Sequence, residues 1–215
     1  MIRILIADDH QLLIDGLRPI LERQQNIEVV GVAKDGLEAA GLSLELNPDV
    51  ILMDISMPRL NGIDATRRIL RENPDIRIII LSMHADRKFI QQSLRAGARG
   101  YILKESASSE VIEAIGAVRK GELFFSLSVR DQVVRDYVDW VRDGKGGTES
   151  PLSAREREVL QMLAEGRSTK DVAANLNISV KTVETHRKQI MDKLDLHSIA
   201  ELTKYAIREG LTDLH

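Results

Sequence analysis

Val50-Ile-Leu-Met-Asp54 is an apolar run that ends in a carboxylate, which predicts a buried strand with a polar side chain at its carboxyl end. Four further runs in the first half of the chain have a similar length and composition. The five predicted strands cover residues 2–7, 27–33, 49–54, 76–82 and 99–103. Segments with the spacing of helices separate them, so strands and helices alternate. This alternation predicts a five-stranded parallel sheet with helices on both faces, a doubly wound α/β fold.

Polar residues stand at the carboxyl ends of four of these strands. They are Asp8, Asp9, Asp54, Ser82 and Lys104. Ligands of open parallel sheets bind outside the carboxyl ends of the strands, so we expect these residues to meet in one pocket. Three carboxylates repel one another unless a cation lies among them, and Mg²⁺ prefers oxygen ligands together with phosphate oxygens. An Asp carboxylate can itself accept a phosphoryl group, and a lysine can neutralise the transferred charge. The pattern therefore predicts a phosphoryl-accepting site.

The composition limits the classes of protein that fit. The 215 residues are 43% hydrophobic and only 3% aromatic, with a formal net charge of −3 and no cysteine. A chain of this length favours two domains, and the lack of cysteine excludes disulfides and thiolate metal sites. The apolar runs are too short to span a bilayer, and the chain starts in a predicted strand rather than in a signal peptide. We therefore expect a cytoplasmic protein that does not bind membranes.

The pattern changes after residue 121. Valines at helical spacing between residues 129 and 141 predict one helix, and Asp143-Gly-Lys-Gly-Gly-Thr148 has the composition of a flexible hinge. We interpret this segment as a helical linker that ends in a hinge.

From residue 151 onward the sequence predicts four short helices. The expected N-cap residues are Ser153, Ser168, Ser179 and Ser198. Only Asn177 and Ile178 stand between one helix and the N-cap of the next, which is a helix-turn-helix layout.

The helix that follows Ser179 is predicted to have two different faces. If Val183 faces the core, Ile190 and Leu194 share its face at about 100° per residue. Lys181, Thr182, Glu184, Thr185 and Lys188 remain as candidates for DNA contact. Short polar and basic side chains on an exposed helix can contact bases or phosphates in a major groove. The net charge of this segment is low, however, so an ordinary surface helix fits the pattern about as well.

The first 120 residues resemble the receiver domain of bacterial two-component response regulators. The resemblance is carried by Asp8-Asp9, Asp54, Met57-Pro-Arg-Leu-Asn-Gly62, Ser82, Tyr101 and Lys104. It implies a flavodoxin-like fold in which Asp54 is phosphorylated and Lys104 contacts the phosphoryl group. It also implies that Ser82 and Tyr101 form the switch. The Mg²⁺ ligands that it implies are Asp8, Asp9, Asp54 and the backbone carbonyl of Ser56.

One residue departs from the receiver pattern. Glu105 follows Lys104, whereas many receivers have a proline there. This departure puts the cis peptide of the family in doubt, because a cis bond before a residue other than proline costs about 3 kcal/mol.

Residues from about 150 to 213 resemble the LuxR-type DNA-binding domain. The resemblance is carried by Leu152-Ser-Ala-Arg-Glu-Arg-Glu-Val-Leu160, the segment from Ala173 to His186, and Lys193-Leu-Asp-Leu196. Glu184 is a departure, since some relatives have a basic residue there.

The two parts together resemble the NarL/FixJ group of response regulators. The group implies a receiver at 1–121, a linker and hinge at 122–150, and a helix-turn-helix domain at 151–215. Its partners would be a sensor histidine kinase as phosphodonor, a double-stranded DNA operator, and a second copy of the chain when phosphorylated or on DNA.

Three other functions fit part of the pattern. A phosphohydrolase would have a spaced Asp-x-Asp rather than an adjacent pair, and a flavodoxin-like cofactor binder would not have the acidic loop Asp8-Asp9-His10-Gln11. A DNA-binding regulator that does not depend on phosphorylation stays as the alternative, although the intact acidic pocket argues against it. We expect no enzymatic activity beyond slow self-dephosphorylation of Asp54.

Overall fold

The structure, a computed structural model, describes residues 1–143 and 151–212. The chain divides into two compact units, the first formed by most residues up to Gly146 and the second chiefly by the residues from Gly147 onward. Most of the predicted hinge, residues 144–148, lies outside the described residues. Within the described residues, no helix is both long and apolar enough to cross a bilayer.

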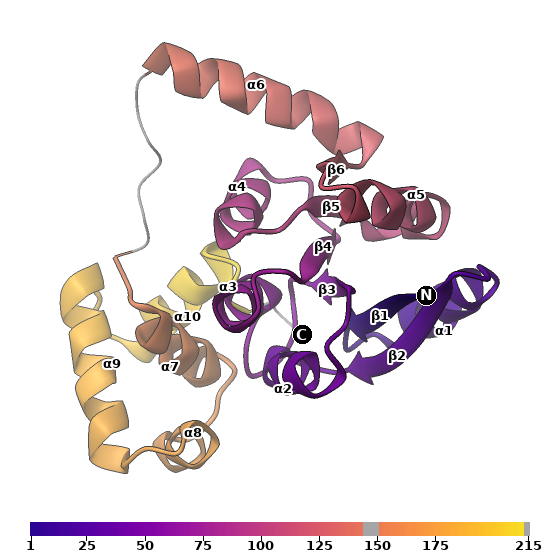
Figure 1. The fold of residues 1–215 in the computed structure, drawn as a ribbon. Coiled ribbons are helices and arrows are strands. Elements are labelled where there is room, and N and C mark those ends of the chain that lie inside the picture. Colours follow the sequence, from indigo (N-terminus) through magenta and orange to yellow (C-terminus); the bar gives the residue numbers. More distant parts are fainter. Residues whose placement is uncertain (144–150, 213–215) are drawn as a thin grey trace. The chain divides into compact units, whose positions relative to one another are not determined.

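A parallel sheet forms the centre of the first unit, and six strands are found among the described residues (Figure 1). The strands are β1 (Ile2–Ala7), β2 (Ile27–Ala33), β3 (Val50–Asp54), β4 (Arg77–Ser82), β5 (Gly100–Leu103) and β6 (Phe124–Phe125). Their order is β2-β1-β3-β4-β5-β6, and every neighbouring pair is parallel. The five predicted strands are confirmed to within one residue, whereas β6 was not predicted. A strand of two residues is too short to show a recognisable alternation.

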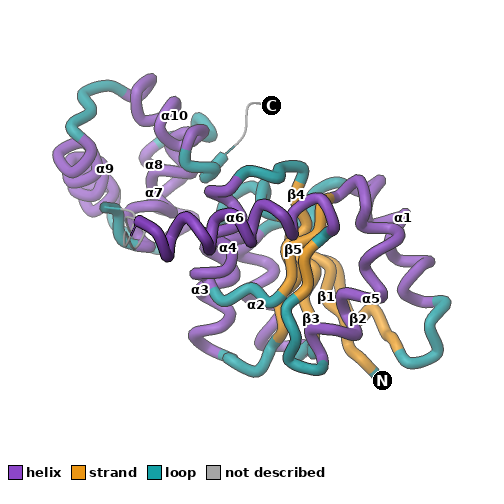
Figure 2. The backbone as a smooth tube through the Cα atoms, turned by 90° about the horizontal axis from the view of Figure 1, so that it is seen from above, coloured by secondary structure: helices purple, strands orange, loops and turns teal. Residues whose placement is uncertain are grey.

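Helices cover both faces of this sheet (Figure 2). One face carries α1 (Gln11–Glu22) and α5 (Ala107–Arg119), and the other carries α2 (Gly36–Leu46), α3 (Gly62–Glu72) and α4 (Arg87–Ala96). Most side chains of β1, β3, β4 and β5 are therefore buried whichever face they point to, and their sequences are largely apolar rather than alternating.

The helix α6 (Leu127–Asp143) follows β6, as the valine spacing predicted. Val129 is buried and Val133 is half-buried, whereas Val134 and Val138 are exposed. The apolar positions of α6 therefore lie on more than one face of the helix.

Ser126 ties the beginning of α6 to the sheet. Its carbonyl accepts hydrogen bonds from the N–H groups of Val129 (2.8 Å) and Arg130 (3.1 Å). Its own N–H donates to the carbonyl of Tyr101 (3.0 Å), and its hydroxyl accepts from the N–H of Leu103 (3.1 Å). The first turn of α6 is thus held by the backbone of β5, and this connection lies beyond the predicted boundary at residue 121.

The second unit contains four helices within the described residues: α7 (Ala154–Ala164), α8 (Thr169–Leu176), α9 (Val180–Leu194) and α10 (Ile199–Arg208). Each predicted N-cap serine accepts a hydrogen bond from the backbone N–H three residues later. The capping box is complete at Ser153 and at Ser168. At Ser198 the Glu201 carboxylate instead accepts from the His197 N–H (2.9 Å) and the Ser198 hydroxyl (2.9 Å).

The turn between α8 and α9 is short, as predicted. Asn177 ends α8 in the left-handed conformation, with φ at 52°, which asparagine tolerates better than most residues. Ser179 then begins α9, so the helix-turn-helix layout is present.

Candidate functional site

Two buried carboxylates lie side by side at the carboxyl edge of the sheet. Ala7 of β1 pairs with Met53 of β3, so the next residues of the two strands, Asp8 and Asp54, are neighbours. Asp8 is 0% exposed and Asp54 is 2% exposed. Burial, and then the charge of Asp8, raise the pKa of Asp54 to about 7. Two such groups can both be ionised only if positive charge lies close to them.

Lys104 supplies positive charge at this point. Its Nζ lies 2.8 Å from Oδ2 of Asp54 and 2.9 Å from Oδ2 of Asp8. Burial by itself would lower the pKa of the Lys104 ammonium, but the two carboxylates raise it above its ordinary value. A backbone hydrogen bond from Ser56 also stabilises the ionised form of Asp54.

Ser82 and Tyr101 come from β4 and β5, which lie on the side of β3 away from β1. Ser82 ends β4, the strand next to β3, and its hydroxyl accepts a hydrogen bond from the His84 N–H (3.0 Å). Tyr101 is fully buried, and its hydroxyl donates to the carbonyl of His84 (2.7 Å). Burial raises the pKa of Tyr101, and a hydrogen bond with Ser82 opposes this rise. The Tyr101 side chain therefore points inward in this structure.

The loop after Asp54 returns to that residue at Gly62. The N–H of Gly62 donates to the carbonyl of Ile55 (2.9 Å), and a Cβ atom at Gly62 would lie 1.9 Å from the carbonyl oxygen of Asp54. Only glycine fits this close approach of two backbone segments. Asn61 then caps α3, because its side chain accepts from the N–H of Asp64 (2.9 Å).

The donor atoms of the pocket suit a hard divalent cation. Asp8, Asp9, His10 and Asp54 each offer a ligand atom, and these atoms all lie within 4.8 Å of one another. Three of the four are carboxylate oxygens, the ligand type that Mg²⁺ prefers. The predicted carboxylates therefore fit Mg²⁺, whereas the role of the Ser56 carbonyl stays a prediction.

His10 was not among the predicted site residues. The sequence did contain a signal, since His10 directly follows Asp8-Asp9 and precedes α1, which places it at the same edge of the sheet. A single histidine at a strand end has many ordinary roles, so its position alone did not identify it.

The Lys104–Glu105 peptide bond is trans. The doubt that Glu105 raised about a cis bond is therefore resolved for this structure.

The helix α9 presents the predicted faces. Val183 and Ile190 are fully buried, and Leu194 is half-buried. Of the candidate DNA contacts, Lys181, Glu184, Thr185 and Lys188 are exposed and Thr182 is half-buried.

The two threonines of this set are held by the helix itself. The hydroxyl of Thr182 lies 2.8 Å from that of the N-cap Ser179, and the hydroxyl of Thr185 donates to the carbonyl of Lys181 (2.9 Å).

An ion pair connects α9 to α7. The Lys193 ammonium donates to the Glu156 carboxylate (2.7 Å), which also accepts from the N–H of Ser153 (2.7 Å) in the capping box of α7. Burial would raise the pKa of Glu156, but the hydrogen bonds from Lys193 and Ser153 lower it below its ordinary value. The last turn of α9 is thus held against the first turn of α7.

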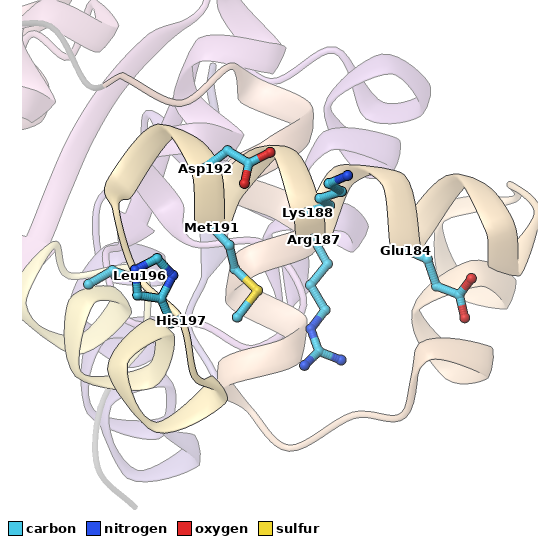
Figure 3. A pocket seen from close by; sticks show the side chains of 7 residues that line it. All are labelled: Glu184, Arg187, Lys188, Met191, Asp192, Leu196 and His197. Atoms are coloured by element: carbon cyan, nitrogen blue, oxygen red, sulfur yellow. The ribbon is translucent and has the colours of Figure 1, made fainter.

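A shallow pocket of about 440 Å³ lies along α9 and the turn that follows it (Figure 3). Its lining residues are Glu184, Arg187, Lys188, Met191, Asp192, Leu196 and His197. Two of these, Glu184 and Lys188, are candidate DNA contacts, so the pocket forms part of that surface.

Two family models match the chain. The response regulator receiver domain matches residues 4–116, and the luxR family of bacterial regulatory proteins matches residues 150–206. The transcriptional regulatory protein MctR of Rhizobium johnstonii is 41% identical over 212 residues, which cover 98% of this chain and 95% of that protein. The oxygen regulatory protein NreC of Staphylococcus haemolyticus is 40% identical over 215 residues, which cover 98% of this chain and 99% of that protein.

One solved structure matches almost the whole chain. RcsB from Salmonella enterica serovar Typhimurium, bound to promoter P1flhDC in the presence of phosphomimetic BeF3−, is 29% identical with a TM-score of 0.61. The match covers 98% of this chain and 99% of that one. The chain therefore belongs to the response regulators of the NarL/FixJ group, which join a receiver domain to a LuxR-type DNA-binding domain.

Proposed function

We propose that Asp54 accepts a phosphoryl group from a sensor histidine kinase and that the reaction requires Mg²⁺. The observation that supports this best is the position of Lys104, whose ammonium lies within 2.9 Å of both buried carboxylates, Asp8 and Asp54. A lysine in this position neutralises charge where a phosphoryl group would arrive.

The reaction is a transfer to a carboxylate. An oxygen of Asp54 attacks the phosphorus of the donor, a new O–P bond forms, and the P–N bond to the donor histidine breaks with its electron pair left on the imidazole. Lys104 balances the charge of the transferred group, and the Ser82 hydroxyl can donate to one of its oxygens. Asp8, Asp9 and Asp54, with the Ser56 carbonyl, would hold Mg²⁺, which supplies further charge neutralisation. The phosphoryl group would be lost only by slow self-catalysed hydrolysis of the aspartyl phosphate.

We assign DNA binding to the second unit. The domains would be the receiver at 1–121, the linker and hinge at 122–150, and the DNA-binding domain at 151–215. Two copies of the chain would place α9 in successive major grooves of a double-stranded operator in the cytoplasm, with Lys181, Thr182, Glu184, Thr185 and Lys188 nearest the DNA.

The test is phosphorylation of the full-length protein by acetyl phosphate, followed by intact mass. Wild type should gain one phosphoryl group when Mg²⁺ is present and none after chelation, because the carboxylate cluster otherwise repels the incoming anion. Asp54→Ala should gain none, whereas Asp75→Asn, at an exposed acidic position, should behave as wild type. Phosphorylation that survives chelation or the loss of Asp54 would contradict the assignment of Asp54 and its pocket.

A further inference from the structure

His10 reaches into the acidic pocket from the beginning of α1. Its Nδ1 lies 2.9 Å from Oδ1 of Asp9, 3.1 Å from Oδ1 of Asp8 and 3.8 Å from Oδ2 of Asp54. The backbone holds the ring there, since the N–H of His10 also donates to Oδ1 of Asp8 (2.8 Å). The side chain is 58% exposed, so the ring has its outer part in solvent and its Nδ1 in the pocket.

The distances between these atoms suit ligands of one metal ion. Adjacent corners of an octahedron with bonds of about 2.1 Å lie about 3 Å apart, and opposite corners lie about 4 Å apart. The spacings of 2.9, 3.1 and 3.8 Å from Nδ1 to the three carboxylate oxygens fall in this range. Asp8 and Asp54 are also buried, so their side chains are fixed by the fold rather than by solvent.

Lys104 and His10 use different oxygens of Asp8 but the same oxygen of Asp54. The ammonium contacts Oδ2 of Asp8, whereas His10 contacts Oδ1 of Asp8 and Oδ1 of Asp9. Oδ2 of Asp54 lies 2.8 Å from the lysine and 3.8 Å from the histidine, and the lysine Nζ lies 3.4 Å from His10 Nδ1, so a cation bound there would share that oxygen with Lys104. The carboxylate of Asp8 thus has one oxygen toward the lysine and one toward the histidine.

We propose that His10 is a nitrogen ligand of the cation site and gives that site a preference for transition-metal ions such as Mn²⁺. The proposal rests on the proposed function, because it concerns the same cation. Oxygen ligands and water satisfy Mg²⁺, which gains little from an imidazole, whereas first-row transition ions bind imidazole nitrogen well. The pocket would then bind both ions, and only the affinity for the transition-metal ion would depend on His10.

The experiment is a titration of the full-length protein with Mn²⁺ and separately with Mg²⁺, by calorimetry and without a phosphodonor. His10→Ala should weaken Mn²⁺ binding by about tenfold or more and Mg²⁺ binding by clearly less, so the ratio of the two affinities should change. Pulsed EPR of the Mn²⁺-loaded wild type should detect a bound nitrogen, and this signal should be lost in His10→Ala.

Two variants separate ligation from other roles of His10. His10→Asn keeps a side chain that can donate to Asp8 and Asp9 but has no imidazole, so it should behave as His10→Ala. Gln11→Ala is the matched control, because the Gln11 side chain donates to Asp15 (2.8 Å) and not to the pocket. An unchanged affinity ratio in His10→Ala, or full recovery in His10→Asn, would show that the imidazole nitrogen does not set the preference and would overturn the proposal.

Failure of the two proposals gives different results. If Mg²⁺ binds and Asp54 is phosphorylated but the affinity ratio does not respond to His10, only the inference about His10 is wrong. If the wild type binds neither cation and Asp54 is not phosphorylated, the proposed function itself is wrong.

Discussion

Gly62 allows the loop after Asp54 to pass close to the backbone of that residue because glycine has no Cβ atom. A Cβ atom there would lie 1.9 Å from the carbonyl oxygen of Asp54 and 2.9 Å from Cγ of Met53. Because the first of these atoms belongs to the backbone, the loop must shift to admit a side chain. We expect Gly62→Ala to destabilise the first unit by roughly 1–3 kcal/mol and to slow phosphorylation of Asp54. Chemical denaturation and the rate of phosphoryl gain from acetyl phosphate are the measurements.

The matched control for this change is Gly41→Ala. Gly41 lies in α2, and a Cβ there would meet nothing within 4 Å. Alanine should therefore stabilise the helix by up to about 1 kcal/mol and leave phosphorylation unchanged. If Gly62→Ala is as stable as Gly41→Ala, the close approach to Asp54 does not constrain the loop.

The sequence identified residues whose positions depend on strand ends. Asp8, Asp54, Ser82 and Lys104 could be grouped because adjacent parallel strands end at one edge of a sheet. The ring direction of His10 could not be foreseen, since it depends on the conformation of the backbone before α1.

At the scale of elements, the contact between α7 and α9 predicts a dependence on pH. The pKa of Glu156 is lowered by Lys193 and Ser153, so the ionised carboxylate stabilises the folded unit. This contribution is complete above the ordinary pKa of a carboxyl group and is lost as the pH falls through the lowered value. We expect Glu156→Gln to destabilise the second unit by about 1 kcal/mol at neutral pH, and the difference from wild type to shrink in acid.

Hydrogen exchange in the full-length protein measures this effect. Exchange of the α7 and α9 amides should become faster in Glu156→Gln, while the amides of β1 and β3 in the first unit should not change. Asp192→Asn, at an exposed position on α9, is the control and should exchange as wild type does. Equal protection in Glu156→Gln at neutral pH would show that the ion pair does not hold α9.

The exposed face of α9 predicts how DNA binding responds to substitution. Loss of a lysine that contacts phosphate should weaken binding to every DNA sequence and reduce the slope of log K against log salt concentration by about one. Loss of a base contact should cost about 1–3 kcal/mol and relax the preference at one position. The measurement is operator binding by Lys181→Ala, Thr185→Ala and Lys188→Ala at several salt concentrations.

The control for these variants is Lys120→Ala, an exposed lysine of the first unit. It should bind the operator as wild type does. If all three α9 variants also bind as wild type while the second unit stays folded, another face of that unit contacts the DNA.

The spacing of apolar residues predicted long helices and strands better than short ones. The 15 residues of α9 contain several helical turns, so the buried positions Val183 and Ile190 could be assigned from spacing. The two residues of β6 are too few to show a repeat in their hydrophobicity. Their place in the sheet depends on hydrogen bonds from the N–H groups of Phe124 and Ser126 to the carbonyls of Arg99 and Tyr101.

For the whole molecule, phosphorylation should change assembly and DNA affinity together. A phosphoryl group adds up to about two negative charges at Asp54, next to Lys104 and Ser82, and should bias an equilibrium between two states of the receiver. We expect a larger dimer fraction and tighter operator binding after phosphorylation, measured by light scattering and fluorescence anisotropy. Asp54→Ala treated with acetyl phosphate is the control. Equal molar mass and equal affinity in both states would favour the regulator that does not depend on phosphorylation.

The hydrogen bonds of Ser126 determine where this regulator can be divided and joined to another. A chimaera with its junction at residue 121 would replace β6 and the hydroxyl that accepts from the N–H of Leu103, the residue before Lys104. A junction after residue 130 keeps the edge strand and the first turn of α6 with the pocket that they support. Exchange of DNA-binding domains between relatives should therefore preserve control by phosphorylation only when the donor receiver brings its own Ser126.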